Sequence, residues 1–465
     1  MYQYKDMEDT IVAIATPPGT GGIGIVRLSG KQSIAIADKM FVAKNKCLPS
    51  EFNGFSAHYG WIRHPSKESI IDEALLTVFR APKSYTAEDV IEISCHGGQA
   101  AVKAILSLAL EMGARLAQPG EFTKRAFLNG RINLVEAEAV LDVINSQTDA
   151  FLRVSTNQLK GELSTELESI REQLMDVYTE IEAIVNFPED DLDAAGRRQI
   201  MERVSVQWDR VKALLESSHN GRILKEGIRV VLCGKPNVGK SSILNALLKQ
   251  QRAIVTEIAG TTRDVLEESA QIQGIPFVLV DTAGILEPRD MIEAEAIKRS
   301  HLYIQSADLV LLVLDISRPI SDEDLLLLDK TKDADLLVIV NKSDLEPAID
   351  EGNLQGLLQG RKVVKISALV KESMGRLESA IVDSVWHGGE HSAHGIMVSN
   401  IRHINALNTT QNSLAGALEI IEQGIALEFA SEELKSAINQ LDGITGRNID
   451  EDLLDKIFSQ FCIGK

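Results

Sequence analysis

The feature that most constrains this chain is a series of short motifs, each directly after a run of apolar residues. The first run, Arg229–Leu232, leads into Gly234–Ser241, which has the pattern G-x-x-x-x-G-K-[ST]. Glycines in such a loop let backbone N–H groups surround phosphates, and the following helix presents its positive N-terminal end to them. Lys240 is expected to reach the β- and γ-phosphates, and the Ser241 hydroxyl to bind Mg²⁺. The motif predicts a phosphate-binding loop.

Two further motifs point to the nucleotide. Asp281-Thr282-Ala283-Gly284 follows Phe277–Val280, and here Asp281 can hold Mg²⁺ through water while the Gly284 N–H contacts the γ-phosphate. Asn341-Lys342-Ser343-Asp344 follows Leu336–Val340. An aspartate there can accept hydrogen bonds from N1–H and the 2-amino group of guanine, which adenine does not offer. Motifs at the carboxyl ends of successive strands predict a GTP site at one edge of a parallel sheet.

The pattern along the chain predicts a multidomain protein, since 465 residues are too many for one core. Residues 1–130 alternate short strands and helices, as in an α+β domain. Residues 131–221 and 388–465 are helical, and residues 222–387 alternate strands and helices as in a Ras-like α/β P-loop domain inserted in the helical domain. One helical stripe is expected to line a long helix, namely Leu159, Leu163, Leu167, Ile170, Leu174, Val177, Ile181 and Ile184.

Composition argues against several other classes. With a formal net charge of -19, the surface as a whole is unsuited to nucleic acid, although a local basic site stays open. No apolar run is long enough to cross a bilayer and Met1–Asp9 lacks a signal-peptide pattern, so we expect a cytoplasmic protein without a membrane partner. Cys47, Cys95, Cys233 and Cys462 lie far apart without metal-ligand spacing, which favours reduced thiols.

The motifs leave the hydrolytic step open. Ras-like enzymes orient water with a Gln directly after D-x-x-G, but Ile285 stands there in this chain. Glu293 is a candidate for positioning water, with a solvated acidic face as the alternative. Thr262 is a candidate second Mg²⁺ ligand or an ordinary turn threonine. Cys462 has the residue type of a small buried hydrophobe, yet its place beside Lys465 argues for an accessible thiol.

Several segments outside these motifs point to one family. They are Asn237 in the phosphate loop, the loop Thr256–Asp264, the terminal Phe461–Lys465, and the patterns within Pro18–Gly30, Glu88–Gly98 and Pro119–Arg131. Over the whole chain these segments resemble the MnmE (TrmE) tRNA-modification GTPases, and the final C-I-G-K is the most specific match. Ala87 and Asn133 depart from the pattern, because the family usually has Gly and Asp at these positions.

The resemblance implies a K⁺-dependent GTPase. Asn237, Thr261 and backbone oxygens of Thr256 and Ile258 would hold K⁺ in the place of an arginine finger, and Glu293 would be the catalytic glutamate. G domains of two subunits would dimerise across the nucleotides. Motifs and resemblance together assign nucleotide binding to Asn237, Val238, Gly239, Lys240, Ser241, Ser242, Thr256, Glu257, Ile258, Ala259, Gly260, Thr261, Thr262, Asp281, Thr282, Ala283, Gly284, Asn341, Lys342, Ser343, Asp344, Ser367 and Ala368.

The resemblance also implies a second ligand and partners. The N-terminal domain would form a homodimer and bind a 5-formyltetrahydrofolate-type one-carbon donor through Arg27, Glu92, Arg131 and Lys465. Cys462 would serve modification but not GTP hydrolysis. An FAD-dependent MnmG partner, in a heterotetramer, would join in adding a carboxymethylaminomethyl group to C5 of the wobble uridine of certain tRNAs.

Other interpretations stay open on the residues alone. Arg27 and Arg131 have an ordinary surface ion pair as their alternative role. A ribosome-assembly switch GTPase is the second functional hypothesis, although no appended basic RNA-binding module is recognisable. A P-loop ATPase or kinase is disfavoured by Asn341–Asp344, because that motif selects guanine.

Overall fold

The computed structural model describes residues 9–67, 69–186, 194–250, 267–281, 303–349, 351–358, 360–386 and 395–465. The chain divides into two compact units. One comprises Met1–Leu141, Gln158–Met175 and Lys435–Lys465, and the other comprises Asp142–Asn157 and Asp176–Leu434.

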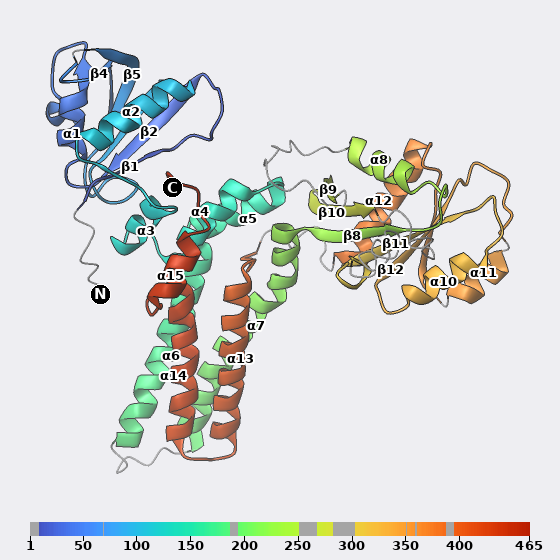
Figure 1. Ribbon diagram of the computed structural model, residues 1–465. Helices are drawn as coiled ribbons and strands as arrows, with labels where there is room; N and C mark the ends of the chain where they lie inside the picture. Colours follow the sequence, from blue (N-terminus) through green and yellow to red (C-terminus); the bar gives the residue numbers. More distant parts are fainter. Residues whose placement is uncertain are drawn as a thin grey trace. The chain divides into compact units, whose positions relative to one another are not determined.

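The first unit is built on a mixed seven-stranded sheet. Across the sheet the strands are β3 (Phe41–Ala43), β4 (Ser56–Arg63), β5 (Ile70–Phe79), β6 (Val90–His96), β2 (Ile23–Ser29), β1 (Ile11–Ile14) and β7 (Arg115–Leu116). Neighbouring strands are antiparallel except β1 and β7. Helices α1 (Ser33–Met40) and α2 (Gln99–Glu111) pack on one face (Figure 1). The predicted N-terminal α+β domain is thus confirmed.

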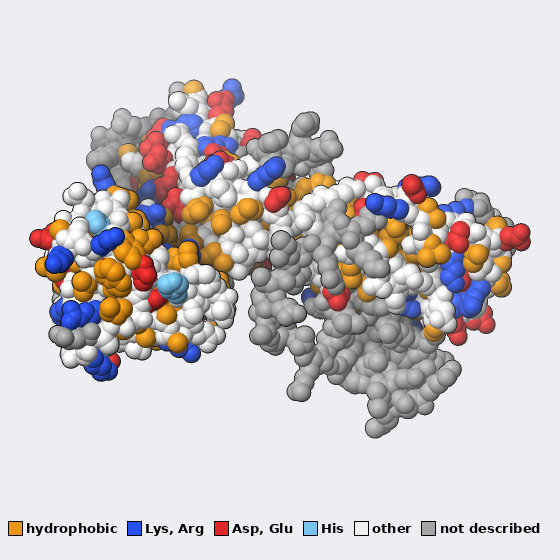
Figure 2. Space-filling model, turned by 90° about the horizontal axis from the view of Figure 1, so that it is seen from above, with side chains coloured by type: hydrophobic (Ala, Val, Ile, Leu, Met, Phe, Trp, Pro, Cys, Tyr) orange, Lys and Arg blue, Asp and Glu red, His pale blue; other side chains and the backbone are white. Residues whose placement is uncertain are grey.

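The opposite face of this sheet is covered at one end by α3 (Glu121–Leu128). Phe122 of α3 packs against Ile11 and Ala13, which alternate with the α2-facing Val12 along β1. Hydrophobic side chains also reach the surface of the molecule (Figure 2). In this unit Ile23 is 67% exposed.

The helical part comprises α4 (Leu134–Asn145), α5 (Asp149–Leu159), α6 (Glu162–Asn186), α7 (Ala194–Glu226), α13 (Ile401–Glu422), α14 (Leu427–Thr445) and α15 (Glu451–Phe458). The long helix predicted from the apolar stripe is α6, whose Leu163–Ile181 members are buried. The expectation is wrong at Leu159, because α5 ends there and Gly161, with φ 89°, breaks the helix. Within the described ranges, no helix is both long and apolar enough to cross a membrane.

The second unit contains a six-stranded sheet. Its order is β13 (Lys362–Lys365), β12 (Leu336–Asn341), β11 (Leu309–Asp315), β8 (Ile228–Cys233), β10 (Ile275–Asp281) and β9 (Glu267–Ile272). One face packs against α8 (Lys240–Gln250) and α12 (Lys371–Val385), the other against α10 (Asp322–Lys330) and α11 (Glu351–Leu358). This confirms the predicted parallel sheet with two covered faces. The antiparallel edge strand β9 was not predicted.

The loop before β6 holds one residue in a strained backbone conformation. Ala87 has φ 61°, in the left-handed region that L-residues avoid. Its neighbours fix this conformation: the Thr86 hydroxyl lies 2.6 Å from that of Ser29, which also donates to Glu88 at 2.7 Å. A glycine at this position would adopt the same φ without steric cost.

Replacing Ala87 by Gly should therefore stabilise the first unit by about 1 kcal/mol. Hydrogen exchange of β6 peptides in the full chain, followed by mass spectrometry, should slow by about fivefold. Ala57→Gly is the control, because Ala57 is an exposed residue of the extended strand β4. A glycine there loses more conformational freedom on folding, so this substitution should speed exchange. Faster exchange in Ala87→Gly would contradict the prediction.

Candidate functional site

The predicted phosphate-binding loop connects β8 to α8. Glycine is required at both ends of the loop: a Cβ on Gly234 would lie 2.6 Å from the Val313 carbonyl oxygen, and one on Gly239 2.2 Å from Asn341 Nδ2. Lys240 Nζ donates to the carbonyl oxygens of Gly234 (2.7 Å) and Lys235 (2.9 Å), so the ammonium lies across the loop.

The side chain of Asn341 joins the base-recognition motif to this loop. It is 2% exposed, and its Nδ2 donates to the Val238 carbonyl at 2.8 Å. Its Oδ1 accepts from the Ala368 N–H at 3.2 Å. Ser367 is buried, and the Ser343 N–H donates to the Ile366 carbonyl at 3.0 Å. Three of the predicted segments therefore meet at the carboxyl edge of the sheet.

Only some of the residues predicted to bind Mg²⁺ or to act in hydrolysis lie within the described ranges. Ser241 and Ser242 are exposed in the first turn of α8, and Asp281 ends β10, which pairs in parallel with β8. Hydroxyl and carboxylate oxygens are the hard ligands that Mg²⁺ takes, so this donor set fits the ion. The predicted residues outside the described ranges are Thr256, Glu257, Ile258, Ala259, Gly260, Thr261, Thr262, Thr282, Ala283, Gly284 and Glu293.

The residues assigned to the one-carbon donor come together around one aromatic ring. Arg27 Nε donates to Glu92 at 2.8 Å. The guanidinium of Arg27, that of Arg131 and the ammonium of Lys465 lie 5.7, 5.0 and 5.8 Å from the centroid of the Tyr85 ring. Sequence reasoning missed Tyr85, although it lies just before the Glu88–Gly98 pattern that carried part of the resemblance.

The electrostatics of this cation cluster (Arg27, Arg131 and Lys465 around Tyr85, with Glu92) favour an anionic ligand. Burial, reinforced by the charge of Arg27, lowers the pKa of Lys465. Burial likewise raises the pKa of Tyr85, whose hydroxyl lies 2.8 Å from that of Thr123. A carboxylate entering the cluster would relieve the repulsion between its cations.

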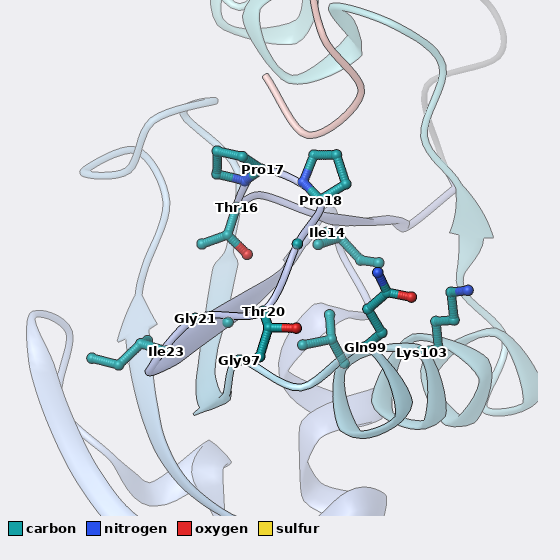
Figure 3. A pocket seen from close by; sticks show the side chains of 13 residues that line it. Ile14, Thr16, Pro17, Pro18, Thr20, Gly21, Ile23, Gly97, Gln99 and Lys103 are labelled. Atoms are coloured by element: carbon teal, nitrogen blue, oxygen red, sulfur yellow. The ribbon is translucent and has the colours of Figure 1, made fainter. Parts of the chain in front are cut away.

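A cavity of about 440 Å³ lies in the same unit, at the glycine-rich turn after β1. Figure 3 shows Pro17, Pro18 and Thr20 on this turn, with Gln99 and Lys103 extending from α2 beside it. The volume suits a small organic molecule. Ile14, which lines the cavity, is also in close contact with the chain terminus, since a Cβ on Gly464 would lie 2.4 Å from its carbonyl oxygen.

The C-terminal segment packs onto the first unit. Arg27 donates to the Gly464 carbonyl at 3.2 Å, and Phe461 is buried. Cys462 is exposed, so the buried role that its residue type favours is wrong and the accessible thiol that its place near Lys465 favours is correct. Cys233, at the end of β8, and Cys95, on β6, are buried.

A phosphate loop tied to an N-K-x-D motif at the carboxyl edge of a mostly parallel sheet defines a Ras-like GTP-binding protein. A family model described as MnmE helical domain matches residues 134–462, and one described as GTP-binding protein TrmE N-terminus matches residues 10–131. The chain belongs to the MnmE family of tRNA modification GTPases.

Full-length relatives agree with this assignment. The tRNA modification GTPase MnmE of Alkaliphilus oremlandii is 42% identical over 460 residues, covering 99% of this chain and 100% of the relative. That of Bacillus subtilis (strain 168) is 43% identical over 458 residues, covering 98% and 100%. Matches over the whole length favour the first functional hypothesis over a ribosome-assembly switch.

The four cysteines should differ sharply in reactivity. Burial raises the pKa of Cys95 to about 11, with Asp72 adding to the shift, and burial raises that of Cys233 to about 12. Because the thiolate is the reactive form and these two thiols stay protonated at pH 8, iodoacetamide should modify Cys47 and Cys462 first. Peptide mass spectrometry checks this, with urea-unfolded protein as the control. Native Cys233 reacting as fast as Cys462 would contradict the assignment.

Proposed function

We propose that this protein is a K⁺-dependent GTPase that, with an FAD-dependent partner of the MnmG type, adds a carboxymethylaminomethyl group to C5 of the wobble uridine of certain tRNAs. The observation that carries GTP as the nucleotide is the tie between Asn341 and the Val238 carbonyl, since it sets the guanine motif beside the phosphate loop. The proposal assigns GTP to residues 222–387, and the one-carbon donor and homodimerisation to residues 1–130.

The K⁺ assignment is supported by the conformation of the phosphate loop. Asn237 is exposed in this loop with φ 63°, and its carbonyl is held by Lys342 at 3.0 Å. A monovalent cation bound by its side chain would supply positive charge at the phosphates, as an arginine finger does in other GTPases. Thr256, Ile258 and Thr261 would complete the K⁺ site, and Glu293 would position the attacking water.

The one-carbon donor is supported by the cation cluster and the neighbouring cavity. A reduced folate has a bicyclic pterin ring and carboxylates. The cavity at the glycine-rich turn can take the ring, and the cations around Tyr85 can take the carboxylates. The exposed Cys462 lies two residues from Gly464, which contacts Arg27. We assign Cys462 to the modification reaction rather than to GTP hydrolysis.

GTP hydrolysis should be faster in KCl than in NaCl at equal ionic strength. We expect an acceleration of at least about tenfold, because a bound cation replaces the charge of an arginine finger. Asn237→Ala should lose the acceleration and keep the slow rate seen in NaCl. The measurement is phosphate release at saturating GTP. Equal slow rates of the wild type in both salts would rule out the K⁺ mechanism.

Arg27→Gln should weaken binding of a reduced folate by about tenfold or more, since a hydrogen bond from a charged group is lost. Isothermal titration of the full chain with 5-formyltetrahydrofolate measures the affinity, and GTP hydrolysis in KCl should not change. Lys124→Gln is the matched control. It removes a cation from α3 that pairs with Asp455 at 2.6 Å and lies outside the cation cluster, so the affinity for folate should not change. The folate proposal fails if the wild type binds no reduced folate.

A further inference from the structure

Asp315 is a buried carboxylate at the nucleotide edge that belongs to none of the predicted motifs. It ends β11, which lies between the phosphate-loop strand β8 and the guanine-motif strand β12. Its side chain is 2% exposed, and Oδ2 accepts from Lys342 Nζ at 2.6 Å. Oδ1 accepts from the backbone N–H and the hydroxyl of Ser317 at 3.0 and 2.7 Å.

This carboxylate is held in its charged form. Burial opposes ionisation, but the hydrogen bonds from Lys342 and Ser317 outweigh it, and the pKa of Asp315 lies below its usual range. The guanidinium of Arg318 adds a longer contact of 3.8 Å. Asp315 therefore presents a fixed negative charge to the Lys342 ammonium.

Lys342 connects the Asp315 carboxylate to the phosphate loop. The same Nζ that binds Asp315 donates to the Asn237 carbonyl at 3.0 Å. Lys342 and Asn237 both adopt left-handed backbone conformations, with φ 64° and 63°. Such conformations persist where surrounding contacts determine them. A lysine side chain that is 30% exposed has many competing rotamers, and the buried carboxylate selects the one that reaches the loop.

We propose that Asp315 is a positioning residue for guanine-nucleotide binding, because its carboxylate holds the Lys342 ammonium against the Asn237 carbonyl. The phosphate loop and the guanine motif are thereby fixed in relation to each other before the nucleotide arrives. The inference rests on the guanine-nucleotide function proposed above. Asp315 would thus contribute to nucleotide binding without contacting the nucleotide.

The test is Asp315→Asn, measured by displacement of a fluorescent guanine nucleotide by GDP. Loss of the charged anchor should weaken GDP binding by about tenfold, and the KM for GTP should rise similarly. The kcat at saturating GTP should stay within about twofold, because the bound nucleotide restores the arrangement. Asp315→Glu, which keeps the charge, should lose less affinity.

Asp142→Asn is the matched control. Asp142 is 8% exposed and pairs at 2.9 Å with Lys225, which is 29% exposed, in the same unit but on helices α4 and α7. Removing its charge should leave GDP affinity unchanged. An equal loss of affinity in both variants would mean a general loss of stability and would overturn the inference.

A double-mutant cycle with Lys342→Met separates positioning from structure. If Asp315 acts through Lys342, Asp315→Asn should add little loss of GDP affinity in the Lys342→Met background. Full additivity of the two losses, or wild-type affinity in Asp315→Asn, would overturn the inference. Failure of the wild-type protein to bind GDP would instead refute the guanine-nucleotide function itself.

Discussion

The nucleotide site depends on the contacts of one buried amide side chain. Asn341 donates to Val238 in the phosphate loop and accepts from Ala368 in the loop after β13. Gly239 must lack a side chain because the Asn341 amide lies where a Cβ would be. An amide can donate and accept at once, which neither a carboxylate nor an ammonium can do at neutral pH. This is why an asparagine stands at position 341.

The first unit depends on a comparable tie, made by the chain terminus. Arg27 binds both Glu92 on β6 and the carbonyl of Gly464. Gly464 has φ 99° and lies against Ile14, so a side chain there would collide with β1. The terminal segment is thus held where Lys465 can complete the cations around Tyr85. This explains two residues of the C-I-G-K pattern in physical terms. Gly464 allows the close contact with Ile14, and that contact places Lys465 beside the Tyr85 ring.

Much of this was predictable because the relevant signals are local. The strands Leu309–Asp315 and Leu336–Asn341 coincide with continuous apolar runs in the sequence. The phosphate loop follows its strand and opens α8 as its pattern predicts. Apolar runs of this length fix parallel strands, and parallel strands bring the residues after them to one edge. Architecture and nucleotide edge therefore follow from periodicity and motif order.

What sequence reasoning missed depends on contacts between residues far apart in the chain. The role of Tyr85 depends on its contacts with Arg27, Arg131 and Lys465. The role of Asp315 depends on its ion pair with Lys342. Neither residue belongs to a motif, so spacing carries no signal for it. Resemblance to a family can indicate which cations matter, but not that they share one ring. The Tyr85 ring brings the three cations together into one candidate site, and because they repel one another this arrangement favours an anionic ligand.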